Sequence, residues 1–307
     1  MAVPATGEQH VLTLDGGAVT AVVAELGASL RELVVDGVPL VQDYGADAIP
    51  SQASGIVLVP WPNRVRAGRW ELDGQPQQLD LTEPSRGNAT HGLLRNTGYR
   101  VTDRSDAAIT LTAPVFPQHG YPFHLDTSVR FELQPDGLTI THGVHNAGDA
   151  PAPVGIGVHP YLRVGDTPVD DLTVTVAAAT AILADDAKIP VGEQDVTGSD
   201  LDLRAGKRLA GVTLDQGYTD IALVDGFVRH RLTAPDGSGV ELWAEPAFAY
   251  TQVFTTDVYE TDDGRIRAVA IEPMTCAADA LNSGRGLRWL EPGDQWVPSW
   301  GLRRIRA

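Results

Sequence analysis

The sequence predicts an all-β protein of antiparallel strands. Seven Asp-Gly dipeptides separate short runs in which apolar and polar residues alternate, for example AVTAVVAEL and GVELWAE. Asp-Gly favours the two-residue turn of a β-hairpin, and alternation places every second side chain on one face of a sheet. The 32 glycines and 21 prolines would interrupt most long helices. Because a sheet of this size must bury its apolar face against another, the pattern indicates a sandwich or a barrel.

Each expected element follows from this alternation. In chain order we expect strands over residues 18–26, 30–37, 138–146, 154–158, 239–245, 249–256 and 268–272. Helix is expected only in short pieces, such as residues 277–282. Residues 184–208 are the most polar stretch, and we interpret them as a long excursion within one domain rather than a boundary. With no repeat and no Ser/Gly linker, we predict a single domain over residues 1–307.

The net charge of the chain limits the kinds of partner that it can attract. A net charge of −17 would repel phosphate backbones and anionic lipid, which favours a small-molecule ligand over nucleic acid or a membrane. The same charge also serves solubility. The N-terminus lacks a basic start and an apolar signal core, and a single cysteine, Cys276, excludes an intramolecular disulfide, so we expect a cytoplasmic monomer or homodimer.

Several familiar chemistries lack their sequence signatures. No two of the eight histidines have the spacing of a zinc site, so no metal is expected. His142 and His145 are three apart in a predicted strand, would point to opposite faces, and are interpreted as structural. The sequence contains neither a G-x-S-x-G elbow nor a glycine-rich phosphate loop.

Four segments hold polar residues in rigid surroundings, and the first is VLVPWPNRVRAGRW. Pro60 and Pro62 fix an extended backbone that would aim Asn63 and Arg64 in a set direction. The alternative is an edge strand that ends in a turn with a solvated arginine.

Two histidines precede a chain-breaking residue. His91 stands before Gly92, which lets the backbone turn sharply or approach a ligand. His159 stands before Pro160 at the end of a predicted strand, where a neutral imidazole is a candidate general acid or base. A turn histidine and a satisfied core histidine are the respective alternatives.

One carboxylate ends an apolar strand. Glu272 follows AVAI, and partial burial would raise its pKa and make it a better base. A structural salt bridge to an arginine is the alternative. Weaker candidates are Asp215 in a predicted turn and Gln252 in a predicted strand.

Six segments together resemble the aldose 1-epimerase (galactose mutarotase-like) family. In chain order they are PWPNRVRAGRW, HGLLRN, GVHPYL, LDQGYTD, YTQVFTT and EPMTCAADALNSGRGLRWLEPGD. The resemblance covers about residues 10–305 and implies a large antiparallel β-sandwich that needs neither a metal nor an organic cofactor.

The resemblance also implies roles. Glu272 matches the catalytic base, His159 the general acid, and His91 a second histidine near the ring oxygen and C1 of the sugar. Arg64, preceded by Asn63, matches an arginine that binds sugar hydroxyls. In a similar way Asp215 resembles the aspartate that grips the substrate and Gln252 a glutamine that contacts the sugar. Because this chain has DQGY where galactose mutarotases carry DH before the aromatic residue, Asp220 is a rival to Asp215.

The expected function is therefore aldose 1-epimerase activity on a free hexose such as glucose or galactose. One alternative is a mutarotase for an anionic sugar, a hexose 6-phosphate or sulfoquinovose, because PWPNR looks closer to a bacterial subgroup that includes sulfoquinovose mutarotase. Such a sugar needs cations near C6, and Arg64, Arg66, Arg69 and Arg95 are available. The other alternative is a carbohydrate-binding protein without catalysis, although such a protein has no need for Glu272 and His159.

Overall fold

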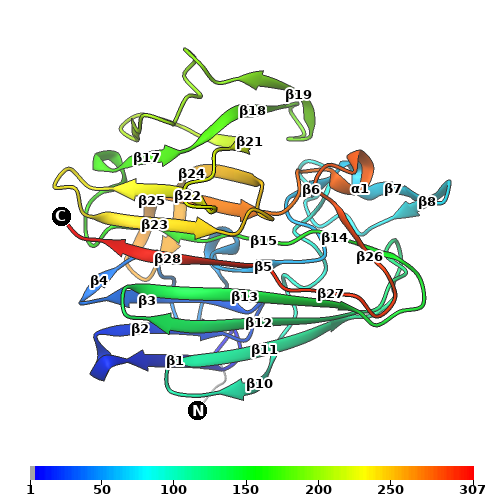
Figure 1. Ribbon diagram of the computed structural model, residues 1–307, viewed down its shortest axis with the longest axis horizontal. Helices are drawn as coiled ribbons and strands as arrows, with labels where there is room; N and C mark the ends of the chain where they lie inside the picture. Colours follow the sequence, from blue (N-terminus) through cyan, green and yellow to red (C-terminus); the bar gives the residue numbers. More distant parts are fainter. Residues whose placement is uncertain (1–3) are drawn as a thin grey trace.

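The computed structural model describes residues 4–307 as an all-β protein of packed sheets, as the sequence predicts (Figure 1). The ten-stranded sheet has the order β10 (Arg100–Arg104), β11 (Ala108–Val115), β12 (Leu125–Gln134), β13 (Gly137–Asn146), β28 (Ser299–Ile305), β23 (Gly239–Ala244), β22 (Val228–Thr233), β17 (Thr173–Val176) and β20 (Lys207–Arg208), with β27 (Gln295–Trp296) also paired to β13. Its long ladders are antiparallel.

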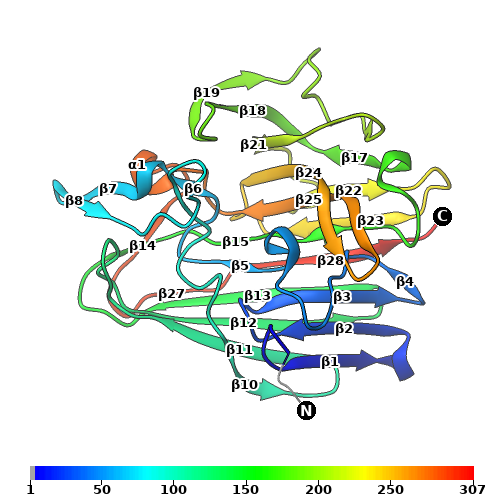
Figure 2. The ribbon, with the colours of Figure 1, turned by 180° about the vertical axis from the view of Figure 1, so that it is seen from behind.

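An eight-stranded sheet carries most of the site. Its order is β19 (Pro190–Asp195), β18 (Ala178–Ala184), β21 (Asp215–Ile221), β24 (Tyr250–Thr261), β25 (Gly264–Met274), β15 (Gly157–Val158) and β5 (Val57–Leu58), with β16 (Tyr161–Leu162) also paired to β25. A third sheet contains β1 (Gln9–Leu14), β2 (Val19–Ala24), β3 (Ser29–Val35) and β4 (Val38–Pro39), and packs on β12 and β13 (Figure 2).

The remaining elements are short. Two-stranded pairs are formed by β6 (Arg64–Val65) with β9 (Ala89–Thr90), β7 (Arg69–Leu72) with β8 (Gln75–Gln78), and β14 (Ala152–Val154) with β26 (Arg288–Leu290). Within residues 4–307, helix is limited to α1 (Ala280–Ser283) and the 3₁₀ turns Asp15–Gly17, Ser51–Ala53, Arg66–Gly68 and Val169–Asp171. The short helix falls where the sequence predicts one.

Four of the seven Asp-Gly dipeptides have the backbone conformation expected of a hairpin turn. Asp15, Asp36, Asp73 and Asp225 have φ of 50°, 47°, 50° and 51°, and each is followed by a glycine with positive φ. Two successive residues of this kind make a type I′ turn, whose twist matches that of the flanking strands.

One apolar core joins the sheets. It includes Val23 of the four-stranded sheet, Leu242 of the ten-stranded sheet, and Val253 and Ile271 of the eight-stranded sheet, all 0% exposed. Burial of apolar side chains between sheets is the main stabilising contribution in such an architecture. The polar stretch 184–208 adds β19 to the edge of one large sheet and leads into β20 at the edge of the other.

The structure separates His142 from His145 as expected. His142 is buried and its Nε2 accepts a hydrogen bond of 3.0 Å from Nε1 of Trp300, whereas the His145 side chain is 42% exposed. No helix in residues 4–307 is both long enough and apolar enough to cross a membrane.

Candidate active site

A cavity of about 560 Å³ opens between the eight-stranded sheet and the β6–β9 region. It is lined by all seven residues singled out in the sequence, namely Asn63, Arg64, His91, His159, Asp215, Gln252 and Glu272. Asp220 does not line the cavity; its Oδ2 accepts a 2.6 Å hydrogen bond from Thr180 Oγ1. The geometry therefore favours Asp215 over its rival.

Glu272 occupies the floor of this cavity. It lies near the end of β25, opposite Gln252 of β24, and is 2% exposed. Its Oε2 has no hydrogen-bond partner in the described part of the chain. Burial raises the pKa of Glu272 well above 4.5, and the negative charge of Asp215 adds to this effect, while Arg64 opposes it.

His159 faces Glu272 from the link between β15 and β16. Its Nε2 lies 3.4 Å from Oε1 of Glu272, and its ring stacks on Tyr161 with centroids 5.2 Å apart. Burial lowers the pKa of His159 from 6.5 to about 4. Burial thus shifts both members of the pair towards their neutral forms.

His91 completes the group at the turn after β9. Its φ is +63°, and its ring lies edge-on to that of His159, with centroids 5.7 Å apart. Gly92 is required next to it, because a Cβ there would collide with the carbonyl of Val59. Burial, followed by the charge of His159, lowers the pKa of His91 well below 6.5.

Arg64 is held by a residue that the sequence analysis missed. Its Nε and Nη2 donate to the two carboxylate oxygens of Glu83 at 2.8 and 2.9 Å. Glu83 also accepts a 3.0 Å bond from Arg86. Such a fork-to-fork pair fixes the guanidinium plane. Asn63, in the left-handed region at φ 56°, accepts the backbone N–H of Arg64 through Oδ1 at 2.9 Å.

Asp215 reaches the cavity from β21. Its Oδ1 accepts a 2.8 Å hydrogen bond from Nε2 of Gln252, and its Oδ2 lies 2.9 Å from Nζ of Lys188. Lys188 belongs to the polar stretch 184–208 and was not among the predicted residues. Phe254 was missed as well, although it shares the parity of Gln252 on β24 and lines the cavity.

Of the four arginines considered for an anionic sugar, two line the cavity, Arg64 and Arg95. Arg66 instead pairs with Asp185 at 3.1 Å, and Arg69 donates to Gln78 at 3.0 Å. Arg95 differs from Arg64 because its buried Nε has no partner in the described residues.

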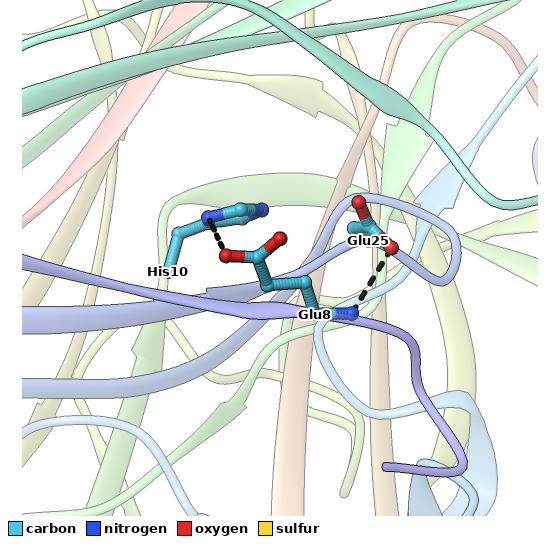
Figure 3. A group of neighbouring side chains, drawn as sticks. All are labelled: Glu8, His10 and Glu25. Atoms are coloured by element: carbon cyan, nitrogen blue, oxygen red, sulfur yellow. Dashed lines mark hydrogen bonds and ion pairs between the residues drawn. The ribbon is translucent and has the colours of Figure 1, made fainter. Parts of the chain in front are cut away.

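A separate cluster of potential metal ligands lies on the first hairpin. Glu8, His10 and Glu25 place one ligand atom each within 4.8 Å of one another (Figure 3). Nη1 of Arg104 lies 3.3 Å from Nδ1 of His10 and already supplies a positive charge there. The group is away from the cavity, and none of its members lines it.

Comparison with known proteins adds a family match. The family model described as aldose 1-epimerase matches residues 10–300. The uncharacterized protein YihR of Escherichia coli K12 is 32% identical over 288 residues, which cover 92% of this chain and 90% of that protein. The uncharacterized protein YphB of the same strain is 28% identical over 152 residues, covering 50% and 51%.

Solved structures share the fold. The GalM/aldose epimerase homologue of C. elegans superposes with a TM-score of 0.85 at 17% identity, covering 98% of this chain and 100% of that one. The galactose 1-epimerase of Lactobacillus acidophilus superposes with a TM-score of 0.77 at 19% identity, covering 97% and 94%. At these identities the likeness establishes the β-sandwich architecture.

Proposed function

The chain belongs to the aldose 1-epimerase family and is an isomerase of the mutarotase type, and we propose that it interconverts the α and β anomers of a free hexose such as glucose or galactose. The observation that carries the proposal is the buried Glu272–His159 pair, 3.4 Å apart at the floor of the cavity. The cavity volume lies within the range of about 300–1,000 Å³ found for small-molecule sites.

The proposed mechanism passes protons between the sugar and this pair. Ionised Glu272 takes the proton from the anomeric hydroxyl while protonated His159 gives a proton to the ring oxygen, which breaks the C1–O5 bond and forms the open-chain aldehyde. Rotation about C1–C2 presents the other face of the carbonyl, and the reverse transfers close the ring as the opposite anomer.

The cycle requires that the pair hold one proton between them. A neutral Glu272 with a neutral His159 carries the same single proton as an ionised Glu272 with a protonated His159, so the reactive form arises by transfer within the pair. Sugar hydroxyls that donate to the free Oε2 of Glu272 would favour the ionised carboxylate.

The walls of the cavity favour a neutral sugar. The charge of Arg64 is matched by Glu83 and that of Asp215 by Lys188, so each pair presents hydrogen-bonding groups with little net charge. Arg64 and Asp215 thus serve as donor and acceptor for hydroxyl groups.

One observation favours the anionic-sugar alternative. Arg95 lines the cavity with a buried Nε that has no partner among residues 4–307, and a sulfonate or phosphate would be a strong acceptor for it. Burial lowers the pKa of Arg95, but an arginine stays protonated at neutral pH, so a bound anionic group would offset the cost of burying this charge.

The test is polarimetry with the purified protein on fresh α-D-glucose, α-D-galactose, glucose 6-phosphate and sulfoquinovose. We expect a faster approach to the same final rotation with a neutral hexose. Acceleration confined to the anionic sugars would replace the proposal by the alternative. Sugar binding without acceleration of any of the four would support a non-catalytic binding protein.

A further inference from the structure

Lys188 stands at an unusual place in the chain. It belongs to the loop between β18 and β19, and its φ of +62° lies in the left-handed region. A non-glycine residue in this region is held there by its surroundings, and such residues gather at functional sites. Asn63 and His91, with φ of 56° and 63°, are two more residues of this kind, and both line the cavity.

The loop that carries Lys188 is attached to the β6–β9 side of the cavity. Asp185 pairs with Arg66 at 3.1 Å, and the carbonyl of Ala187 accepts a 2.8 Å hydrogen bond from Nδ2 of Asn88. Within the loop, Oδ1 of Asp185 accepts the backbone N–H of Ile189 at 3.0 Å. The loop therefore bridges the β6–β9 side and the β21 side, and its placement defines where the Lys188 ammonium lies.

The Lys188 contact fixes the second oxygen of Asp215. With Oδ1 bonded to Gln252 at 2.8 Å and Oδ2 2.9 Å from Lys188 Nζ, the carboxylate cannot rotate without losing one partner. Each carboxylate oxygen keeps a further lone pair for a sugar hydroxyl. A small recess of about 30 Å³, lined by Lys188, Asp215, Gln252 and Arg64, continues the cavity at this point.

Lys188 also lies beside a charge that acts on Glu272. The negative charge of Asp215 disfavours ionisation of Glu272, and a cation 2.9 Å from Asp215 reduces that effect. Removing the cation alone would expose Glu272 to the full charge of Asp215.

We propose that Lys188 is a positioning residue of the sugar site, which orients Asp215 for the substrate and screens its charge from Glu272. This inference rests on the proposed function of the same cavity. A loop anchor without a role in the site is the competing explanation, and it predicts a change in stability alone.

The variant Lys188→Met removes the charge and keeps most of the length, and Lys188→Arg restores a cation. The matched control is Lys207→Met, a lysine of the same polar stretch that pairs with Asp200 at 3.3 Å and does not line the cavity. Mutarotation of α-D-glucose and α-D-galactose gives KM and kcat across pH, and calorimetric titration with the same sugars gives affinity.

For Lys188→Met we expect the KM to rise about two- to fivefold, the range for one partly exposed ion pair. We also expect the acidic limb of kcat/KM to move to higher pH, since loss of the cation raises the pKa of Glu272. Lys188→Arg should recover both values, and Lys207→Met should leave them unchanged. An unchanged KM and pH profile in Lys188→Met, with or without a loss of stability, would overturn the inference.

The wild-type protein separates this inference from the proposed function. An inactive wild type that binds sugar, with weaker binding in Lys188→Met, would refute the catalytic proposal and support the role of Lys188. An active wild type with an unaffected Lys188→Met variant would support the catalytic proposal and refute the role of Lys188. A wild type that neither binds nor accelerates either hexose would overturn both.

Discussion

The polar groups at the floor of the cavity (Glu272, His159 and His91) differ from two charged groups on its walls (Arg64 and Asp215) in whether they have partners within the protein. On the floor, Oε2 of Glu272 and Nδ1 of both His159 and His91 are buried without partners in the described residues. On the walls, Arg64 and Asp215 have their charges matched by Glu83 and Lys188. Buried polar groups without partners are energetically unfavourable, and a bound ligand can satisfy those that line a cavity. For these five residues the difference coincides with the proposed division between groups that exchange protons with the sugar and groups that hold it, whereas Arg95, whose buried Nε also lacks a partner, does not follow it.

The largest effect should come from the floor. His159→Gln keeps a polar side chain but cannot protonate the ring oxygen, so we expect kcat to fall by about 10²- to 10⁴-fold, the usual contribution of a general acid. Polarimetry at saturating sugar measures it. The exposed His145→Gln serves as the control, and equal losses in the two variants would remove the distinction between floor and surface.

A smaller effect, on KM, is expected from the wall. Glu83→Gln keeps the shape of the side chain but removes the bidentate charge partner of Arg64, so the guanidinium loses its fixed plane. We expect KM to rise about tenfold, or about 1.4 kcal/mol, with kcat nearly unchanged. Arg86→Gln, which removes the other arginine that contacts Glu83, is the matched variant and should have less effect. A fall in kcat with constant KM in Glu83→Gln would show that Glu83 acts in the chemical step, as the floor residues do, rather than in sugar binding.

The pH dependence of stability gives a test without substrate. Burial lowers the pKa of His159 and His230 to about 4 and that of His142 to about 3, from 6.5. The unfolded chain therefore binds more protons in this window, and the stabilisation from neutral histidines, complete above about pH 6.5, is lost as pH falls towards about 4. Glu272 has the opposite sign: its raised pKa stabilises the folded state below about 4.5, and this contribution is lost as pH rises.

Urea unfolding between about pH 7 and pH 5 measures this slope. We expect the free energy of unfolding to decrease as pH is lowered from about 7 to about 5. The decrease should be less steep in His159→Gln. An identical slope in the wild type and the variant would show that His159 is not buried as a neutral group.

The smallest effect is expected outside the cavity. Asp220 bonds Thr180 rather than facing the site, so Asp220→Asn should leave KM within about twofold. Asp215→Asn, which alters the wall itself, should raise KM more. Kinetics on both variants make the comparison, and the reverse order would return Asp220 to the site.

The sequence predicted more of the floor than of the walls. Glu272 and His159 stand at strand ends beside residues that break the pattern, and such local signals are visible in one segment. Phe254 was within reach of the same reasoning, because it shares the strand parity of Gln252. Glu83 and Lys188 lie in loops, and their roles depend on contacts 19 and 27 residues away in the chain, with Arg64 and Asp215. No local pattern encodes such a pairing.

For the fold as well, local signals were predictable from the sequence and long-range pairings were not. The Asp-Gly turns and the alternation of residues predicted antiparallel hairpins, because both act over a few residues. Alternation alone left a sandwich and a barrel open, and it could not give the order of the strands. The pairing of β13 with β28, for example, joins the middle of the chain to its C-terminal segment.

The most direct test of the central claim is polarimetry of α-D-glucose and α-D-galactose with the wild type and Glu272→Gln at equal concentration. Glutamine keeps the size of the side chain and can accept no proton as a base. We expect the folded variant to lose activity by about 10²- to 10⁴-fold. Near-normal turnover in a folded Glu272→Gln would contradict the assignment of the Glu272–His159 pair as the catalytic centre.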